Sequence, residues 1–280
     1  MLIKRFLPLM VLTCTFLSCA AQHGQETLAT ITGVEPQPLL AQAMRLKEAL
    51  SFLGSSISKE DEKRLEALQH SPLTQKTVQA IQEILDPYCL AMVNINPEAR
   101  VKVARGPAAA KLMQNGWTSF LVKVHNEAGV RAQLKAESPH AAPALHISTF
   151  SSRTPDKNKI SAGQLANRFI EVQMYESRPL SQRLSGLLLE YAVVQIYSKD
   201  AGKREVEMGF NVGQGTQDIG FRNTISILFD IDPSVKVLFS VKDEDGSPAM
   251  ASFVITDGIE RLIGDSVKAI NRPPVDYRFS

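Results

Sequence analysis

Apolar residues recur at helical spacing in the first part of the chain. The first predicted helix begins at Pro38 and ends before Gly54-Ser55-Ser56, with one apolar face made of Leu39, Ala43, Leu46, Leu50 and Leu53. Ser58, followed by Asp61, has the pattern of an N-cap and opens a second helix. A third helix is expected from Ser71-Pro72 to Asp86-Pro87, with Val78, Ile81, Ile84 and Leu85 on its apolar face. Such short helices must pack on one another or on the next domain.

From Cys89 onward the apolar pattern has the period of two that is typical of β-strands. Residues 120–125 alternate, the turn Asn126–Gly129 follows, and residues 130–136 alternate again. This pattern predicts a two-stranded hairpin with one solvated face, on which Lys123 and His125 lie.

A second hairpin is predicted further along the chain. Residues 187–197 are apolar on both sides, as in a central strand, and a turn at 198–203 leads into an alternating strand at 206–212. Another strand is expected at 225–229, and a last hairpin joins 235–241 to 249–256. Residues 137–167 are predicted to form a long surface loop, and 258–280 an extended, unpaired tail.

Strands at this spacing, without intervening helices, indicate the fold class. We expect a mainly β protein with a small N-terminal helical segment, built as an antiparallel β-sandwich of the immunoglobulin or transthyretin kind.

The N-terminus has the organisation of a signal peptide. Lys4 and Arg5 precede an apolar core from Phe6 to Leu17, and small residues follow at 18–21. The core is shorter than the roughly 20 residues of a membrane-spanning helix. We therefore predict that residues 1–20 are removed and that the chain is exported to the periplasm or the medium. Lipid anchoring at Cys19 is the alternative; Phe16 weakens it, since a lipobox prefers a small aliphatic residue there.

Charge and cysteine content narrow the classes of partner. The chain has 31 Lys and Arg against 29 Asp and Glu, and loss of residues 1–20, with two bases and no acid, leaves 29 of each. A neutral chain lacks the basic surface of a nucleic-acid binder. Cys14 and Cys19 lie in the leader, so Cys89 would be the sole thiol of the processed chain and no internal disulfide is expected.

No motif in the sequence predicts catalytic, cofactor-binding or metal-binding residues. The histidines at 23, 70, 125, 140 and 146 form no metal-ligand spacing, and no G-x-S-x-G elbow occurs. Gly213-Gln214-Gly215 and Asp243–Gly246 are each explained as turns, in preference to a phosphate cradle and a calcium loop. Cys89 is expected to be a buried, inert thiol. Trp117 and Tyr191 are interpreted as core or sheet-edge residues.

Three segments resemble a known family. They are GWTSFLVKVHNEAGV at 116–130, YSKDAGKRE at 197–205 and VGQGTQDIGFR at 212–222. They are similar to the front half of large exported bacterial CehA/McbA-type metallohydrolases, which end in a hydrolase domain related to the polymerase-and-histidinol-phosphatase fold. The similarity runs from about Pro36 to the end of the chain. Separately, residues 237–254 resemble the opening hairpin of carboxypeptidase-regulatory-like domains, which are small transthyretin-type sandwiches.

The resemblance implies an accessory role, because the family's metal cluster belongs to its C-terminal domain and nothing in this chain matches it. It implies a helical segment at 36–88, a β-sandwich domain at 89–232 and an incomplete carboxypeptidase-regulatory-like domain at 233–280. We expect non-catalytic exported modules, in a truncated or split form of the hydrolase, whose partner is a downstream hydrolase domain or an envelope component. An independent envelope adhesion or ligand-binding protein is the alternative, and a hydrolase site assembled from scattered loop residues is a third.

Overall fold

The computed structural model describes residues 28–141, 167–213, 223–235, 238–250 and 275–276. Several predictions concern residues outside these ranges: the signal peptide with Cys19, most of the loop at 137–167, the second strand of the last hairpin from 251 onward, and most of the tail.

Three α-helices form the first part of the described chain: α1 (Pro36–Phe52), α2 (Lys59–Ala67) and α3 (Gln75–Leu85). Short 3-10 turns follow α2 and α3, at η1 (Leu68–His70) and η2 (Asp86–Tyr88). The Ser58 hydroxyl accepts the Asp61 N–H at 3.1 Å, which confirms the predicted N-cap. The third helix begins later than predicted, because Thr74 is its N-cap and shares reciprocal hydrogen bonds with Thr77.

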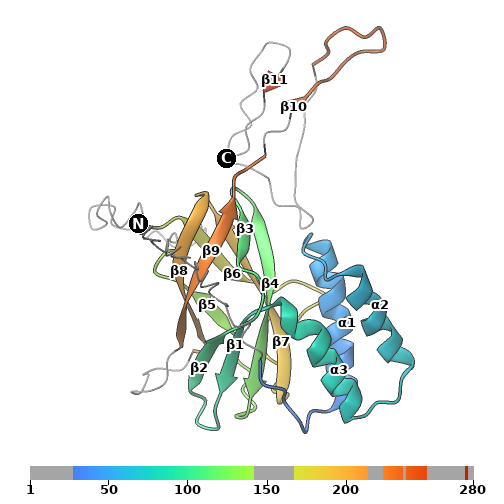
Figure 1. Ribbon diagram of the computed structural model, residues 1–280, viewed down its shortest axis with the longest axis vertical. Helices are drawn as coiled ribbons and strands as arrows, with labels where there is room; N and C mark the ends of the chain where they lie inside the picture. The colour runs from blue at the N-terminus through green and yellow to red at the C-terminus, as the bar shows by residue number, and fades with distance from the viewer. Residues whose placement is uncertain (1–27, 142–166, 214–222, 236–237, 251–274, 277–280) are drawn as a thin grey trace, which may run out of the picture.

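Most of the remaining described chain forms two sheets (Figure 1), so the protein is mainly β with a small helical part. The first sheet has the order β2 (Val101–Arg105), β1 (Cys89–Ile95), β4 (Trp117–Asn126), β7 (Leu189–Ser198), β6 (Ile170–Met174). The second has the order β3 (Lys111–Met113), β9 (Thr224–Asp232), β8 (Gly202–Asn211), β5 (Lys135–Glu137). A two-stranded pair joins β10 (Leu238–Phe239) to β11 (Val275–Asp276). Val275–Asp276 is therefore paired, contrary to the prediction of an unpaired tail.

The sheets are mixed, and the prediction of a wholly antiparallel architecture is wrong. β1 is parallel to β4, and β3 is parallel to β9. The chain leaves β1 through β2, crosses to the second sheet as β3, and returns on the other side of β1 as β4. That crossover gives β4 the same direction as β1.

Both predicted sandwich hairpins are also wrong, and of the strand predicted at 130–136 only Lys135 and Ala136 lie in a strand, β5. β4 and β5 belong to different sheets, as do β7 and β8; β5 and β9 are instead the antiparallel partners of β8. After β4 the side chain of Asn126 holds the turn: its amide donates to the Val130 carbonyl and its oxygen accepts the Val130 N–H, both at 2.9 Å. The chain then passes to the other sheet, so the alternation of polarity on the two sides of this turn did not identify which strands pair.

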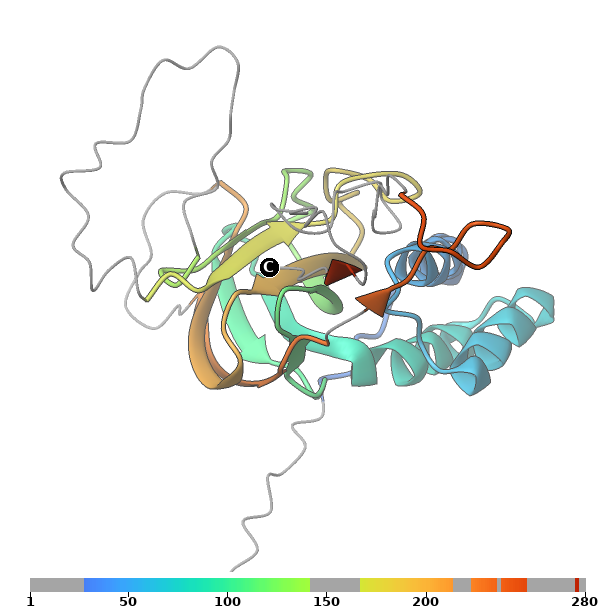
Figure 2. The same cartoon turned by 90° about the horizontal axis from the view of Figure 1, so that it is seen from above.

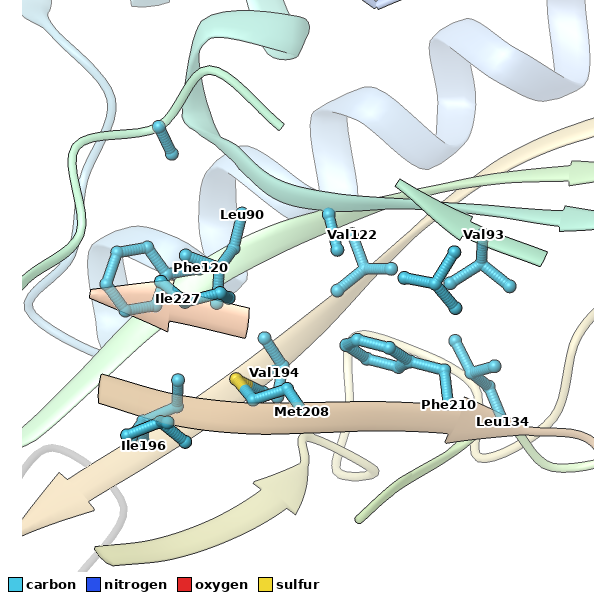
Figure 3. Close-up of a cluster of buried hydrophobic side chains, with 14 of the residues drawn as sticks. Leu90, Val93, Phe120, Val122, Leu134, Val194, Ile196, Met208, Phe210 and Ile227 are labelled. Atoms are coloured by element: carbon cyan, nitrogen blue, oxygen red, sulfur yellow. The ribbon is translucent and has the colours of Figure 1, made fainter. Parts of the chain in front are cut away.

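Two apolar clusters lie on the two faces of the first sheet. Between the sheets, side chains from β4 and β7 meet side chains from β8 and β9, and Figure 3 shows Val122, Val194, Met208, Phe210 and Ile227 directed toward one another. On the opposite face, α1 and α3 cover β4 and β7, and Figure 2 shows the helices together on one side of the strands. This double coverage explains why residues 189–198 are apolar on both sides.

Among the helices that the structure describes, none is long and apolar enough to cross a membrane.

Candidate functional site

A groove lies between helix α1 and the chain that connects β6 to β7. The groove arises because β6 pairs with β7 only as far as Met174↔Val194. The Tyr175 N–H makes one more hydrogen bond to β7, to the Val193 carbonyl at 2.9 Å, and the chain then leaves the sheet. The resulting cavity has a volume of about 1000 Å³. We call it the α1 groove; its lining comes from α1, from residues 174–187, and from β7 at residues 190–193, with Leu134 at one side.

Polar groups at the floor of the α1 groove already have hydrogen-bond partners within the fold. The Tyr191 N–H, at the edge of β7 that β6 has left, donates to the side-chain oxygen of Gln42 on α1 at 2.9 Å. Glu190 is only 3 % exposed, and its carboxylate accepts the N–H groups of Ser185 at 2.7 Å and Gly186 at 3.0 Å. Gly186 has φ +85°, which favours glycine, so Glu190 fixes the shape of the loop beside the groove.

The rim of the groove carries three exposed arginines, Arg45 from α1 and Arg178 and Arg183 from the connecting chain. Within the described ranges, the side chains of these arginines make no hydrogen bond or ion pair. Of the acids nearby, Glu176 accepts a hydrogen bond from Gln133, and Glu48 is exposed on α1. The rim thus presents guanidinium groups without a side-chain partner among the described residues, and guanidinium groups bind carboxylate or phosphate groups.

Behind the groove, a buried ion pair joins α3 to the first sheet. Lys123 is fully buried, and its ammonium donates to Asp86 Oδ2 at 2.7 Å and to the Ala29 carbonyl at 2.9 Å. The Tyr191 hydroxyl donates to Asp86 Oδ1 at 2.8 Å. Burial raises the pKa of the Asp86 carboxyl, against the opposing pull of Lys123 and Tyr191. Burial and the neighbouring Asp86 charge likewise raise the pKa of Tyr191 well above its usual value.

Lys123 was predicted on a solvated face, and that prediction is wrong. The helical segment covers this face of β4, so Lys123 needs the Asp86 carboxylate and the Ala29 carbonyl to satisfy its charge. The bonds tie these groups to one another, which gives the cluster a structural role in holding the helices on the sheet.

Cys89 and the described histidines are spread over the fold. Cys89 is buried as predicted, and burial raises the pKa of its thiol well above the usual range. His70 is exposed in η1, His125 Nδ1 lies 3.3 Å from Asn94 Oδ1, and His140 Nδ1 accepts the Glu207 N–H at 3.3 Å. His23 and His146 lie outside the described residues. In the part of the chain that the structure describes, no group of three or more His, Cys, Asp or Glu could hold a metal ion.

The turn predicted at Asp243–Gly246 is confirmed, and the one predicted at Gly213-Gln214-Gly215 is described only at Gly213. Gly213 has φ +78° and its N–H donates to Asn211 Oδ1 at 3.1 Å; Gln214 and Gly215 lie outside the described residues. At the tip of the last hairpin the Asp243 N–H donates to the Ser247 carbonyl at 2.8 Å, and Gly246 has φ +82°.

Trp117 contacts Tyr197 at the end of the first sheet, with ring centroids 5.5 Å apart. Tyr191 is 3 % exposed, in the helix-facing cluster. Both positions fit the predicted core or sheet-edge roles.

The periodic patterns of the sequence do not identify the residues of the α1 groove. Arg45 lies off the apolar face of the first predicted helix, and Arg178 and Arg183 lie in a segment with no periodic pattern. The one available signal was Glu190, an acid inside an otherwise apolar strand, which indicates a buried carboxylate with dedicated hydrogen-bond donors.

Comparison with known proteins assigns the chain to no family: no protein-family model matches it, and no curated protein matches it. One solved structure, described as surface layer protein SbsC, domains 1–6, is similar over 54 % of this chain and 18 % of that chain. The sequence identity is 8 % and the TM-score is 0.22, a value at which the likeness does not establish a shared fold.

Proposed function

We propose that this chain is a non-catalytic, exported accessory module that docks a partner through the α1 groove. The observation that carries the proposal is the contrast between the groove's rim and its surroundings. Arg45, Arg178 and Arg183 are exposed and make no side-chain bond within the described ranges, whereas the buried Lys123 and Glu190 are each engaged by neighbouring groups of the fold. Such a site suits binding, because its free groups can recognise a ligand and its buried ionisable groups are committed to structure.

The resemblance of residues 116–130, 197–205 and 212–222 to CehA/McbA-type metallohydrolases supports an accessory role. On that basis the partner is a hydrolase domain or an envelope component, and the region 89–232 is a sandwich of the immunoglobulin or transthyretin kind. Export rests on the sequence of residues 1–20, with secretion preferred to a lipid anchor at Cys19.

Photo-crosslinking tests whether the groove is the docking surface. A photoreactive residue placed at Ala41, half-buried in the groove lining, should give a discrete adduct in cells that produce the full chain. The matched control places the same residue at Leu228, which is 61 % exposed on β9. Equal adducts at both positions, or none at Ala41, would contradict docking through this groove.

Mass spectrometry and metal analysis test the other two parts of the proposal. The intact mass of envelope material should correspond to loss of about 20 residues, as for a cleaved signal peptide. A chain that still begins at Met1 would refute export, and a diacylglyceryl group on Cys19 would establish the lipid-anchored form. One bound transition metal per purified chain, or hydrolysis of a generic ester or phosphoester, would refute the absence of catalysis.

A further inference from the structure

The tip of the last hairpin presents an acidic and apolar surface away from the two sheets. Asp243, Glu244 and Asp245 are consecutive and exposed, and Met250 is 95 % exposed just beyond them. The tip is ordered by the antiparallel bridge between Lys242 and Pro248 and by the hydrogen bond that closes the turn. Figure 1 shows the hairpin projecting from the body of the molecule, beyond the end of the second sheet.

Part of the α1 groove, beside the exposed Glu48, carries charges opposite to those of the tip. Its rim carries Arg45, Arg178 and Arg183, and its lining includes Phe52, which is 52 % exposed. Its volume of about 1000 Å³ is at the upper end of the roughly 300–1,000 Å³ of small-ligand pockets, so it can hold the side chains of a short turn.

We propose that the hairpin tip of one copy of this chain binds in the α1 groove of a second copy. Three carboxylates would meet three guanidinium groups, which bind carboxylates through paired N–H donors. Met250 would lie against Phe52, a favourable sulfur–aromatic contact that removes two exposed apolar side chains from water. The inference rests on the proposed function, since it names a second copy as the occupant of the docking groove.

The arrangement predicts how the copies assemble. Tip and groove are different surfaces of one chain, so the contact is heterologous and each copy keeps one free tip and one free groove. Copies therefore add head to tail. Ion pairs between exposed side chains are individually weak and are screened by salt, so assembly requires concentrated protein at low ionic strength.

Two variants of the full chain, each with three charged side chains replaced by uncharged ones, provide the test. The tip variant carries Asp243→Asn, Glu244→Gln and Asp245→Asn, and the groove variant carries Arg45→Gln, Arg178→Gln and Arg183→Gln. The matched control removes three exposed cations outside the groove, through Lys59→Gln, Lys102→Gln and Lys203→Gln. Sedimentation velocity is measured from about 10 to about 500 µM protein, a range chosen for weak interfaces. Runs in roughly 0.05 and 0.5 M NaCl compare Debye lengths of about 14 and 4 Å.

The native chain and the control should form species larger than dimers at low salt and become monomeric at high salt. The tip and groove variants should each associate at least about tenfold more weakly. An equimolar mixture of the two should form a one-to-one dimer and nothing larger, because it contains one intact tip and one intact groove per pair.

A native chain that stays monomeric over the whole range overturns this inference, as does a control that weakens assembly equally or a mixture that forms no dimer. A monomeric chain whose Ala41 position still crosslinks to another protein would overturn the second copy as occupant while leaving the proposed docking function intact.

Discussion

The buried ion pair behind the groove gives the largest single effect that we expect from one substitution. Lys123→Met should lower the free energy of unfolding by about 3–5 kcal/mol, the cost of breaking a buried pair by removing one partner. Lys123 has no exposed surface, and the side chain of Asp86 is 16 % exposed. Methionine is of similar length and preserves most of the packing, so the loss comes from the Asp86 carboxylate, which keeps the Tyr191 hydrogen bond but loses its cation.

Lys47 provides the matched control, because it makes an ion pair of similar length at the surface. Lys47 and Glu66 lie 2.6 Å apart with 23 % and 52 % of their side chains exposed, so Lys47→Met should cost less than about 1 kcal/mol. Adding Asp86→Asn to Lys123→Met should recover part of the loss, since no unpaired buried charge remains.

Urea denaturation followed by circular dichroism measures these differences through the transition midpoint and slope. The pH dependence gives a second check. Burial already raises the pKa of Asp86, and removal of Lys123 raises it further, so the defect of Lys123→Met should shrink as the pH falls and Asp86 becomes protonated. The reasoning is refuted if Lys123→Met costs no more than Lys47→Met, or if the double variant is less stable than Lys123→Met alone.

Three further predictions concern other parts of the fold. Gly106→Ala should lower the free energy of unfolding by about 1–3 kcal/mol or more, because the added Cβ would lie 2.1 Å from the Cys89 carbonyl oxygen. Gly116→Ala is the control, and it should change the free energy of unfolding by no more than about 0.5 kcal/mol, because the nearest atom to its Cβ would be 3.5 Å away. Urea titration compares the two variants, and equal losses of stability would contradict the steric argument. Burial acts to raise the pKa of Asp61, but hydrogen bonds from Tyr88, Ser58 and Arg64 lower it overall, so its contribution to stability is present above its ordinary value of 3.8 and lost as the pH falls. The native chain should therefore lose more stability than Asp61→Asn between about pH 6 and pH 3, and parallel losses in thermal melts would rule this out. The Cys89 thiol should resist a thiol reagent in the native chain and react in denaturant, as followed by peptide mapping; rapid native modification would show that it is accessible.

The sequence by itself determined the local elements of this protein. The helices α1, α2 and α3, the N-cap at Ser58 and the strands β4, β7, β8 and β9 all lie where the periodicity placed them, within a few residues. Helix and strand positions follow from side-chain spacing and from capping and turn residues, which act over a few neighbouring positions. The burial of Cys89 followed in the same way, because the residues that follow it are apolar on both faces of the strand.

Only the tertiary structure decided which strands and which distant side chains contact one another. Alternation shows that one face of β4 is apolar, but it does not show that β4 lies between β1 and β7, or that β5 joins the other sheet. A lysine at an alternate position is interpreted as solvated, and Lys123 is buried only because α3 brings Asp86 to it. The α1 groove depends on long-range packing in the same way, since its rim joins Arg45 to Arg178 and Arg183, which are more than 130 positions away. Contacts between distant segments depend on which layers cover one another, and local sequence patterns do not record that choice.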